Sequence, residues 1–202
     1  MALNFANNNS LSAITTKPSG LSGGTMNLIS TQTASSSATI SFTSGIDSTY
    51  DEYVFKFYNI HPASNTVNFQ INASTDGGSN YNVTKTTSYF LAYHTENDSG
   101  TALQYYANRD LAQSTSAQQI VTIGNTNDDS ASGTLTLYNP SSSVFVKHFI
   151  SRLQAPTGEA TQNCKDTYVA GYFNTTSAIN AVQFTMSSGN IDSGVIKLYG
   201  VS

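Results

Sequence analysis

INAVQFTMSSGNIDSGVIKLYGVS, residues 179–202, decides the fold class of this chain. In its first half, Val182, Phe184 and Met186 alternate with small or polar residues, which is the pattern of a half-buried β-strand. A second β-rich run, Val195 to Tyr199, follows a Ser/Gly/Asn/Asp cluster and ends close to the last residue. The stretch therefore predicts a C-terminal hairpin whose second strand is woven into a sheet.

The same alternation continues upstream, back to Thr25. Tyr53, Phe55 and Phe57 share one face of a strand whose other face is only half polar, so we expect this strand in the centre of a sheet. Val67, Phe69 and Ile71 alternate with amide side chains in the cleanest half-buried strand of the chain. Roughly ten to twelve short strands of this kind predict an all-β fold, a two-sheet β-sandwich that is jelly-roll-like, as a single domain over residues 25–202.

The middle of the chain is the least regular part. Tyr105, Tyr106, Arg109 and Asp110 lie in either a strand or one short helical turn. Residues 156–166 are predicted to form a long polar loop between two strands.

Residues 1–24 form a polar, low-complexity segment that carries isolated apolar side chains. These are Leu3, Phe5, Leu11, Ile14 and Leu21. No strand or helix period fits them, and Pro18, Gly20 and Gly23 interrupt any regular element. The segment is either a disordered terminus or an extended N-terminal arm, with Leu3, Phe5, Leu11 and Ile14 docking on a neighbouring subunit.

The composition restricts the partners. Charged residues make up 10% of the chain, the net charge is −4 and the pI is about 5.1. A basic footprint for nucleic acid or for an anionic membrane is missing, and no apolar run approaches the ~18 residues of a membrane span. The first residues lack the features of a signal peptide, so we expect assembly in a cytoplasm. The lone Cys164, expected to be buried or partly buried, excludes an internal disulfide and any multi-cysteine metal site.

The segment Ser74 to Tyr81 has the spacing S-x-D-x-G-x-x-aromatic of the Asp-box turn. In that turn the aspartate accepts backbone N–H groups and the aromatic ring packs beneath it. We therefore interpret Asp76, Gly77 and Gly78 as structural residues of a hairpin turn.

Few residues suggest catalysis. His61, His94 and His148 lie in three different segments, and the carboxylate pairs Asp51/Glu52 and Asp128/Asp129 are sequence neighbours that we read as solvated turns. No G-x-S-x-G elbow occurs, and the NTNDDS segment lacks a calcium-site spacing. The sequence predicts no enzyme, no cofactor and no metal site.

Sugar binding is the rival hypothesis from another function class. Tyr89, Tyr93, Tyr105 and Tyr106 could offer stacking faces beside amide hydrogen-bonding groups. The chain has no Trp, the residue such platforms use most. Packing of these tyrosines in the core or between subunits is the favoured interpretation.

Two stretches carry a family resemblance. They are ISFTSGIDSTYDEYVFKFYNIHPASNTVNFQINASTDGGSNYN, from Ile40 to Asn82, and INAVQFTMSSGNIDSGVIKLYGV at the end. Their shared elements are Y-D-x-Y at Tyr50 to Tyr53, N-I-x-P at Asn59 to Pro62, the turn from Ser74 to Ser79, and the final strands from Phe184 to Gly200. This pattern resembles the small β-sandwich virion proteins of tailed bacteriophages, particularly marine ones.

The resemblance implies a non-enzymatic structural protein on the exterior of a virion. Such a protein would decorate the capsid or form a head fibre, and would attach through the N-terminal arm and through homo-oligomer contacts, with a trimer favoured. Its partners would be other virion proteins. The alternative is a fibre or tail-tip module that recognises a host glycan. Residues 84–178 match no pattern of the family, so a distinct role would be encoded there.

Overall fold

The structure is a computed structural model, and it describes residues 26–157 and 162–201. Twelve strands and one short 3-10 turn, η1 (Ala107–Arg109), make up its regular elements. The strands are β1 (Met26–Ser37), β2 (Thr39–Phe42), β3 (Glu52–Pro62), β4 (Val67–Ser74), β5 (Lys85–Thr95), β6 (Thr101–Tyr105), β7 (Gln118–Ile123), β8 (Ala131–Tyr138), β9 (Lys147–Thr157), β10 (Asn163–Phe173), β11 (Ala181–Met186) and β12 (Ile191–Val201). No helix within this part of the chain is long and apolar enough to cross a membrane.

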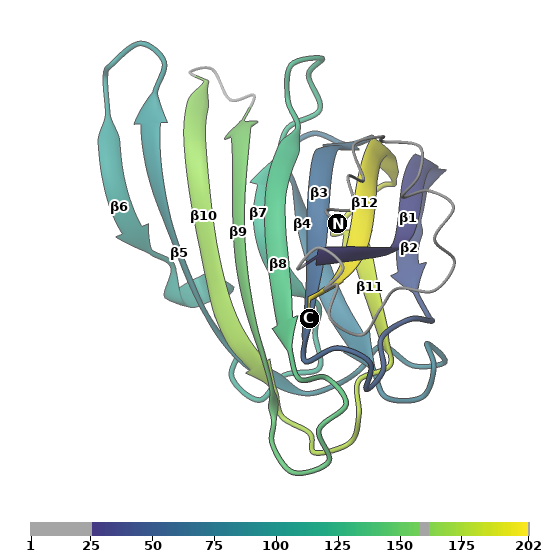
Figure 1. The fold of residues 1–202 in the computed structure, drawn as a ribbon. Coiled ribbons are helices and arrows are strands. Elements are labelled where there is room, and N and C mark those ends of the chain that lie inside the picture. Colours follow the sequence, from purple (N-terminus) through teal and green to yellow (C-terminus); the bar gives the residue numbers. More distant parts are fainter. Residues whose placement is uncertain (1–25, 158–161, 202) are drawn as a thin grey trace, which may run out of the picture.

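The strands form two antiparallel sheets that pack face to face (Figure 1). The larger sheet has eight strands in the order β1-β12-β3-β8-β9-β10-β5-β6, and the smaller has four in the order β2-β11-β4-β7. The predicted all-β, two-sheet β-sandwich is therefore confirmed. The predicted central position of β3 is also correct, because β3 pairs with β12 on one side and β8 on the other.

The core between the sheets is rich in phenylalanine rings. Phe184 of β11 lies at its centre, and four rings surround it with centroids 5.2–6.3 Å away. They are Phe42, Phe55, Phe57 and Phe69. These residues are the inward parity of their strands, so the alternation in the sequence is the direct cause of this packing.

The predicted C-terminal hairpin is wrong. β11 belongs to the four-stranded sheet and β12 to the eight-stranded sheet, so the connection crosses from one sheet to the other. Gly189 supplies a left-handed residue in this connection, with φ +70°. Alternation shows which side chains of a strand are buried but not which strand pairs with it. A hairpin and a connection between two sheets therefore give the same sequence pattern.

Two hairpins from the irregular middle of the chain extend the larger sheet. β9 and β10 pair with each other, β5 pairs with β10, and β6 forms the outer edge. Figure 1 shows these strands standing beside the sandwich, on the side away from β1. Most of the predicted loop at 156–166 belongs to β9 and β10, because a polar strand with no covered face lacks the alternation that would reveal it.

Two buried lysines close the inner face of this extension. Lys85 and Lys147 are the cross-strand neighbours of Phe173, one on each side, and neither has any exposed surface. Lys85 Nζ donates to the Ser116 carbonyl at 2.7 Å, and burial lowers the pKa of Lys85 to about 8. Burial also lowers the pKa of Lys147, whose ammonium contacts three loop carbonyls. Each lysine ties loop backbone to the sheet, because buried carbonyls need donors.

Candidate functional site

The candidate site is the outer face of the extension formed by β9, β10, β5 and β6. We call outer the face of the eight-stranded sheet that points away from the four-stranded sheet. The register places Phe90 of β5 beside Tyr168 of β10, and Tyr168 beside Arg152 of β9. These side chains belong to the outward parity, since their strand neighbours Tyr89, Val169 and Leu153 are buried.

Phe90, Tyr168 and Arg152 form a stacked ladder across three strands. The Phe90 and Tyr168 rings are parallel within 2°, with centroids 4.9 Å apart. The Arg152 guanidinium lies 5.0 Å from the Tyr168 ring centroid and donates to both oxygens of Asp166, at 2.7 Å for Nη2 to Oδ2 and 3.0 Å for Nε to Oδ1. The bonds from Arg152 hold the pKa of the Asp166 carboxyl below its usual value, and burial together with the bond to Asp166 raises the pKa of Tyr168. The three side chains form a ridge on the outer face, with the apolar Phe90 ring at one end and the Arg152–Asp166 ion pair at the other.

Shallow hollows lie on both sides of this ridge. The larger, about 550 Å³, lies over Ser88 and Ala170 and is bordered by Ile150, His148 and Tyr172. The smaller, about 380 Å³, lies over Ser132 and Thr134 and contains Gln154, Cys164 and the Arg152–Asp166 pair. Both hollows are lined mostly by apolar atoms, although the smaller one also contains the Arg152–Asp166 pair.

The four tyrosines predicted as stacking platforms do not form one surface. Tyr89 is fully buried, and its hydroxyl accepts a hydrogen bond from Arg109 Nη1 at 3.0 Å. The Arg109 guanidinium also lies 4.4 Å from the centroid of the Tyr106 ring. Tyr93 packs against the core, whereas Tyr105 is 61% exposed. Of the four, only Tyr105 presents most of its surface to solvent.

Asp110 fixes the position of Tyr105 and of the segment around it. Its Oδ2 accepts the Tyr105 hydroxyl and its Oδ1 accepts the Tyr89 backbone N–H at 2.7 Å. The bond to Asp110 raises the pKa of Tyr105. The strand and the short helical turn expected as alternatives both occur here, because β6 ends at Tyr105 and η1 follows at Ala107.

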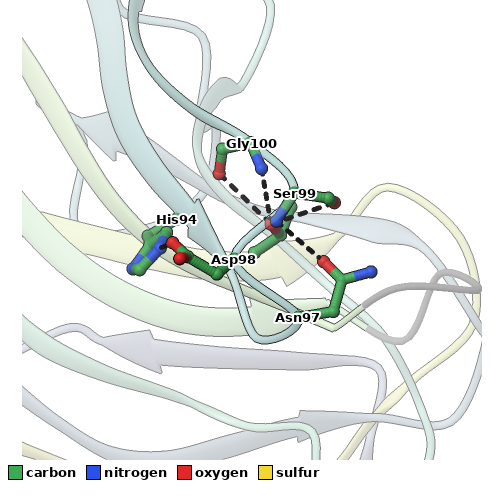
Figure 2. A network of polar contacts seen from close by, with 6 residues as sticks. His94, Asn97, Asp98, Ser99 and Gly100 are labelled. Carbon is green, nitrogen blue, oxygen red and sulfur yellow. Dashed lines mark hydrogen bonds and ion pairs between the residues drawn. The ribbon is translucent and has the colours of Figure 1, made fainter.

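The tip of the β5–β6 hairpin is a network of short-range polar contacts (Figure 2). His94 Nε2 lies 2.9 Å from Asp98 Oδ1, and Asn97 Oδ1 accepts the Ser99 backbone N–H at 3.1 Å. The Thr95 hydroxyl accepts the Gly100 N–H at 2.9 Å. These contacts close the turn of the hairpin. The contact with Asp98 gives the His94 side chain a polar partner within the protein.

The predicted Asp-box turn is present, with Asp76 in its structural role. Asp76 Oδ1 accepts the Ser74 hydroxyl at 2.6 Å and the Asn80 backbone N–H at 2.9 Å. Gly77 donates to Asn180 at 2.8 Å, and Gly78, with φ +92°, has no room for a Cβ, which would lie 2.7 Å from the Tyr81 hydroxyl. The turn does not join a hairpin, however, because it leads from β4 in the smaller sheet to β5 in the larger.

We predict that Asp76→Ala lowers the melting temperature by about 2–4 °C, the shift expected for losing one cap in a domain of this size. Bonds from Ser74 and Asn80 lower the pKa of Asp76 to about 2, against about 3.9 in an unfolded chain. The stabilisation is therefore complete above about pH 4 and is lost as the pH falls towards 2. Thermal melts of both proteins between pH 2 and 7 should show the difference shrinking in that window. An Asp76→Ala protein that melts like the wild type but loses binding to a partner would make Asp76 a site residue instead.

The candidate catalytic residues do not converge. His61 Nδ1, near the end of β3, lies 3.9 Å from Asp192 at the start of β12, and His148 lies on the outer face beside Tyr172. Asp51 and Glu52 stand at the start of β3, away from the Asp128–Asp129 turn. Across residues 26–157 and 162–201, no group of three or more His, Cys, Asp or Glu residues is placed to hold a metal.

Two local predictions about burial are wrong. Asp129 is buried rather than solvated, because its carboxylate folds back to accept the Thr126 N–H and hydroxyl at 3.2 and 2.7 Å. Cys164 is exposed, because its parity on β10 is outward.

The arm residues Leu3, Phe5, Leu11 and Ile14 lie outside the described residues.

Sequence reasoning missed the ladder itself. Phe90 and Tyr168 each stand in an aromatic-rich strand, and their outward parity was readable from the alternation. Their contact depends on the register between β5 and β10, which no local pattern contains.

No protein-family model matches the chain, and searches of curated proteins and of solved structures find no match either.

Proposed function

We propose that this chain is a non-enzymatic structural protein on the exterior of a tailed-phage virion, of the capsid-decoration or head-fibre type, assembled in the host cytoplasm. The observation that carries the proposal is the broad outer face of the eight-stranded sheet. Large apolar side chains are exposed on it, among them Leu28, Leu103, Tyr105 and Ile150. They are distributed over this face from β1 to β6, and exposed apolar side chains on one face favour contact with other macromolecules.

The strand order favours the jelly-roll interpretation of the sandwich. Without the β5–β6 and β9–β10 hairpins, the sheets reduce to β1-β12-β3-β8 and β2-β11-β4-β7. Eight strands in these two blocks, with nearly every connection crossing between sheets, follow the order of a jelly roll. Jelly rolls recur in viral capsid domains and in lectins, so this order supports a virion role and leaves glycan recognition as the rival.

The two added hairpins support a specialised role for the middle of the chain. Both lie within residues 84–178, the part that matches no pattern of the resembling family. They double the width of one sheet without adding a covering layer. We infer that this extension is the part of the domain that distinguishes it from a plain decoration sandwich.

Attachment is proposed to use the N-terminal arm together with contacts between copies in a homo-oligomer, with a trimer favoured. A few docked apolar side chains give little net free energy after the ordering cost of about 1–2 kcal/mol per backbone residue. Several arms linked in one oligomer act at a high effective concentration, which compensates for weak single contacts.

Deletion of residues 1–20 is expected to leave a folded domain that no longer joins particles, because the first described strand begins at Met26. The measurement is occupancy on purified particles, with circular dichroism as the control for folding. A Leu3→Ala, Phe5→Ala chain separates loss of the apolar contacts from loss of the whole segment. Full occupancy by the deleted chain would contradict attachment through the arm.

Glycan recognition by a fibre or tail-tip module remains the second candidate, favoured by the exposure of Tyr105 on the outer face. The comparison is binding to host cell envelope by the wild type and by a Tyr105→Ala, Tyr106→Ala variant. Envelope binding that vanishes with the two tyrosines, together with full particle occupancy without the arm, would favour this candidate over decoration.

A further inference from the structure

One long edge of β6 pairs with no other strand in the part of the chain that the structure describes. β6 stands last in the order of the eight-stranded sheet, with β5 on one side, and Figure 1 shows it at the outer limit of the extension. The register between β5 and β6 runs without a shift from the Phe90–Tyr105 pair to the His94–Thr101 pair. β6 is therefore a regular strand, and its second edge presents an unbroken row of backbone groups.

The hydrogen bonds at the two ends of the β5–β6 ladder show which backbone groups of β6 are free. At one end Thr95 N donates to Gly100 O at 3.0 Å. At the other end Tyr106 N donates to Tyr89 O, also at 3.0 Å. Alternate residues of an antiparallel strand direct both their N–H and their C=O at the partner strand, so the even-numbered residues of this segment face β5. The residues that direct both groups away from β5 are Thr101, Leu103 and Tyr105.

The side chains of these three residues lie on the outer face and are exposed. They pair with the outward parity of β5, to which Phe90 belongs. Leu103, in the middle of the strand, is 73% exposed, more than any other large apolar side chain among the described residues. Tyr105 is 61% exposed, and its hydroxyl donates to Asp110, which holds the ring in place. The free edge thus combines unpaired backbone groups with apolar surface.

β6 lacks the features by which edge strands usually resist pairing with another chain. These features are charged side chains, prolines and β-bulges. The sequence of β6, TALQY, contains no charged residue and no proline. The edge strands β1 and β7, by contrast, each pair through a register shift, at Leu28/Ser30 in β1 and opposite Phe69/Gln70 in β7. Only the short length of β6 limits what can pair with it.

We propose that the free edge of β6 pairs antiparallel with the same edge of a second copy of the chain, around a two-fold axis at Leu103. In this register Leu103 lies opposite Leu103 of the second copy, and Thr101 lies opposite Tyr105. The free N–H and C=O groups of the three residues then match those of the second copy. The two eight-stranded sheets become one continuous sheet, and the leucine and tyrosine side chains of both copies adjoin on its outer face.

A second copy fits this edge better than an unrelated strand does. The free groups are arranged symmetrically about Leu103, so the edge is complementary to itself, as a two-fold contact requires. Because β6 is uncharged, self-pairing places no like charges opposite each other. β5 already holds β6 in an extended form, so little backbone ordering is needed on association. The inference does not rest on the proposed virion role, and this two-fold contact is separate from the trimer contact proposed for attachment.

The first test is the mass of the full chain in solution over a range of concentrations, measured by small-angle X-ray scattering. Five residues from each copy make a small interface, so the dimer should dissociate on dilution. At high concentration the mass should approach twice that of Leu103→Lys, which places like charges opposite each other. Val144→Lys is the matched control, because Val144 is 68% exposed but lies outside β6, and it should behave like the wild type. Both changes are at exposed positions, and circular dichroism checks that both proteins fold.

The second test is cross-linking in a Cys164→Ser background, which removes the only native cysteine. Opposite residues of a hydrogen-bonded antiparallel pair have Cα atoms about 5.5 Å apart, a distance that a disulfide can span. Leu103→Cys should therefore form a covalent dimer under mild oxidation. A mixture of Thr101→Cys and Tyr105→Cys chains should form more covalent dimer than either variant alone, since these two positions face each other only between copies.

Three results would overturn the proposal. The first is a wild-type chain that stays monomeric up to about 1 mM, where even a millimolar dissociation constant gives visible dimer; the free edge would then be left to a strand of another protein. The second is an equal mass for wild type and Leu103→Lys at every concentration. The third is Thr101→Cys that cross-links with itself as readily as with Tyr105→Cys. None of these results affects occupancy on particles, which tests the virion role separately.

Discussion

Phe184→Ala is expected to lower the free energy of unfolding by about 3–5 kcal/mol, the range measured for Phe to Ala changes in closely packed cores. Phe184 has no exposed surface and contacts rings from both sheets. Its removal leaves a cavity that β11 cannot close, because the strand is held between β2 and β4. Urea unfolding followed by fluorescence or circular dichroism measures the change.

Two further substitutions define the cause of that loss. Phe184→Leu keeps an apolar side chain in place and should recover most of the stability. Thr185→Ala, on the opposite parity of the same strand, should change the free energy of unfolding by less than about 0.5 kcal/mol. A Phe184→Ala protein as stable as the Thr185→Ala protein would show that the two sheets do not meet around this ring.

Lys147→Met is expected to lower the free energy of unfolding by about 2–4 kcal/mol. The Lys147 ammonium donates to the carbonyls of Ser142, Phe145 and Thr175, the last two at 2.9 and 3.2 Å. Loss of a charged donor leaves buried carbonyls unsatisfied, at about 1–3 kcal/mol each, while removal of a buried charge recovers part of its desolvation cost. The net loss is therefore smaller than the sum of three bonds.

The same substitution should open the loop between β8 and β9. Val144 and Phe145 are each 68% exposed, and Lys147 holds the backbone beside them. Limited chymotrypsin digestion should cut at Phe145 faster in Lys147→Met than in the wild type. Lys56→Met is the control, because Lys56 is only partly buried and contacts a tyrosine ring rather than loop carbonyls. Equal stability and equal cleavage of both variants would contradict the role given to Lys147.

The sequence was sufficient for those features of the fold that depend on one strand at a time. The half-polar second face of the strand that carries Tyr53, Phe55 and Phe57 correctly predicted a central strand, and the S-x-D-x-G spacing correctly predicted the Asp76 turn. Both signals are local, because alternation and turn chemistry act over a few residues.

The features that the sequence did not reveal depend on which strands meet. The crossing from β11 to β12, the extension of the larger sheet and the ladder of Phe90 and Tyr168 all follow from strand pairing over long sequence separations. The exposed Cys164 and the buried Asp129 were mispredicted for related reasons: the first takes the parity of an unrecognised strand, and the second folds back on Thr126. Of the tyrosines predicted as stacking platforms, Tyr105 is exposed and Tyr89 is fully buried.

The pairing of β1 with β12 has a consequence for biosynthesis. Met26 lies opposite Val201, and β12 is also the partner of β3, so the last described strand separates two of the earliest. While a ribosome is still making the chain, β1 and β3 have no common partner and the larger sheet lacks its second strand. Contacts between such distant residues make folding slow, and the unpaired strands stay open to neighbouring chains in the meantime. The larger sheet can therefore be completed only after β12 has been synthesised, and insertion of β12 between β1 and β3 is the step that closes this end of the sheet.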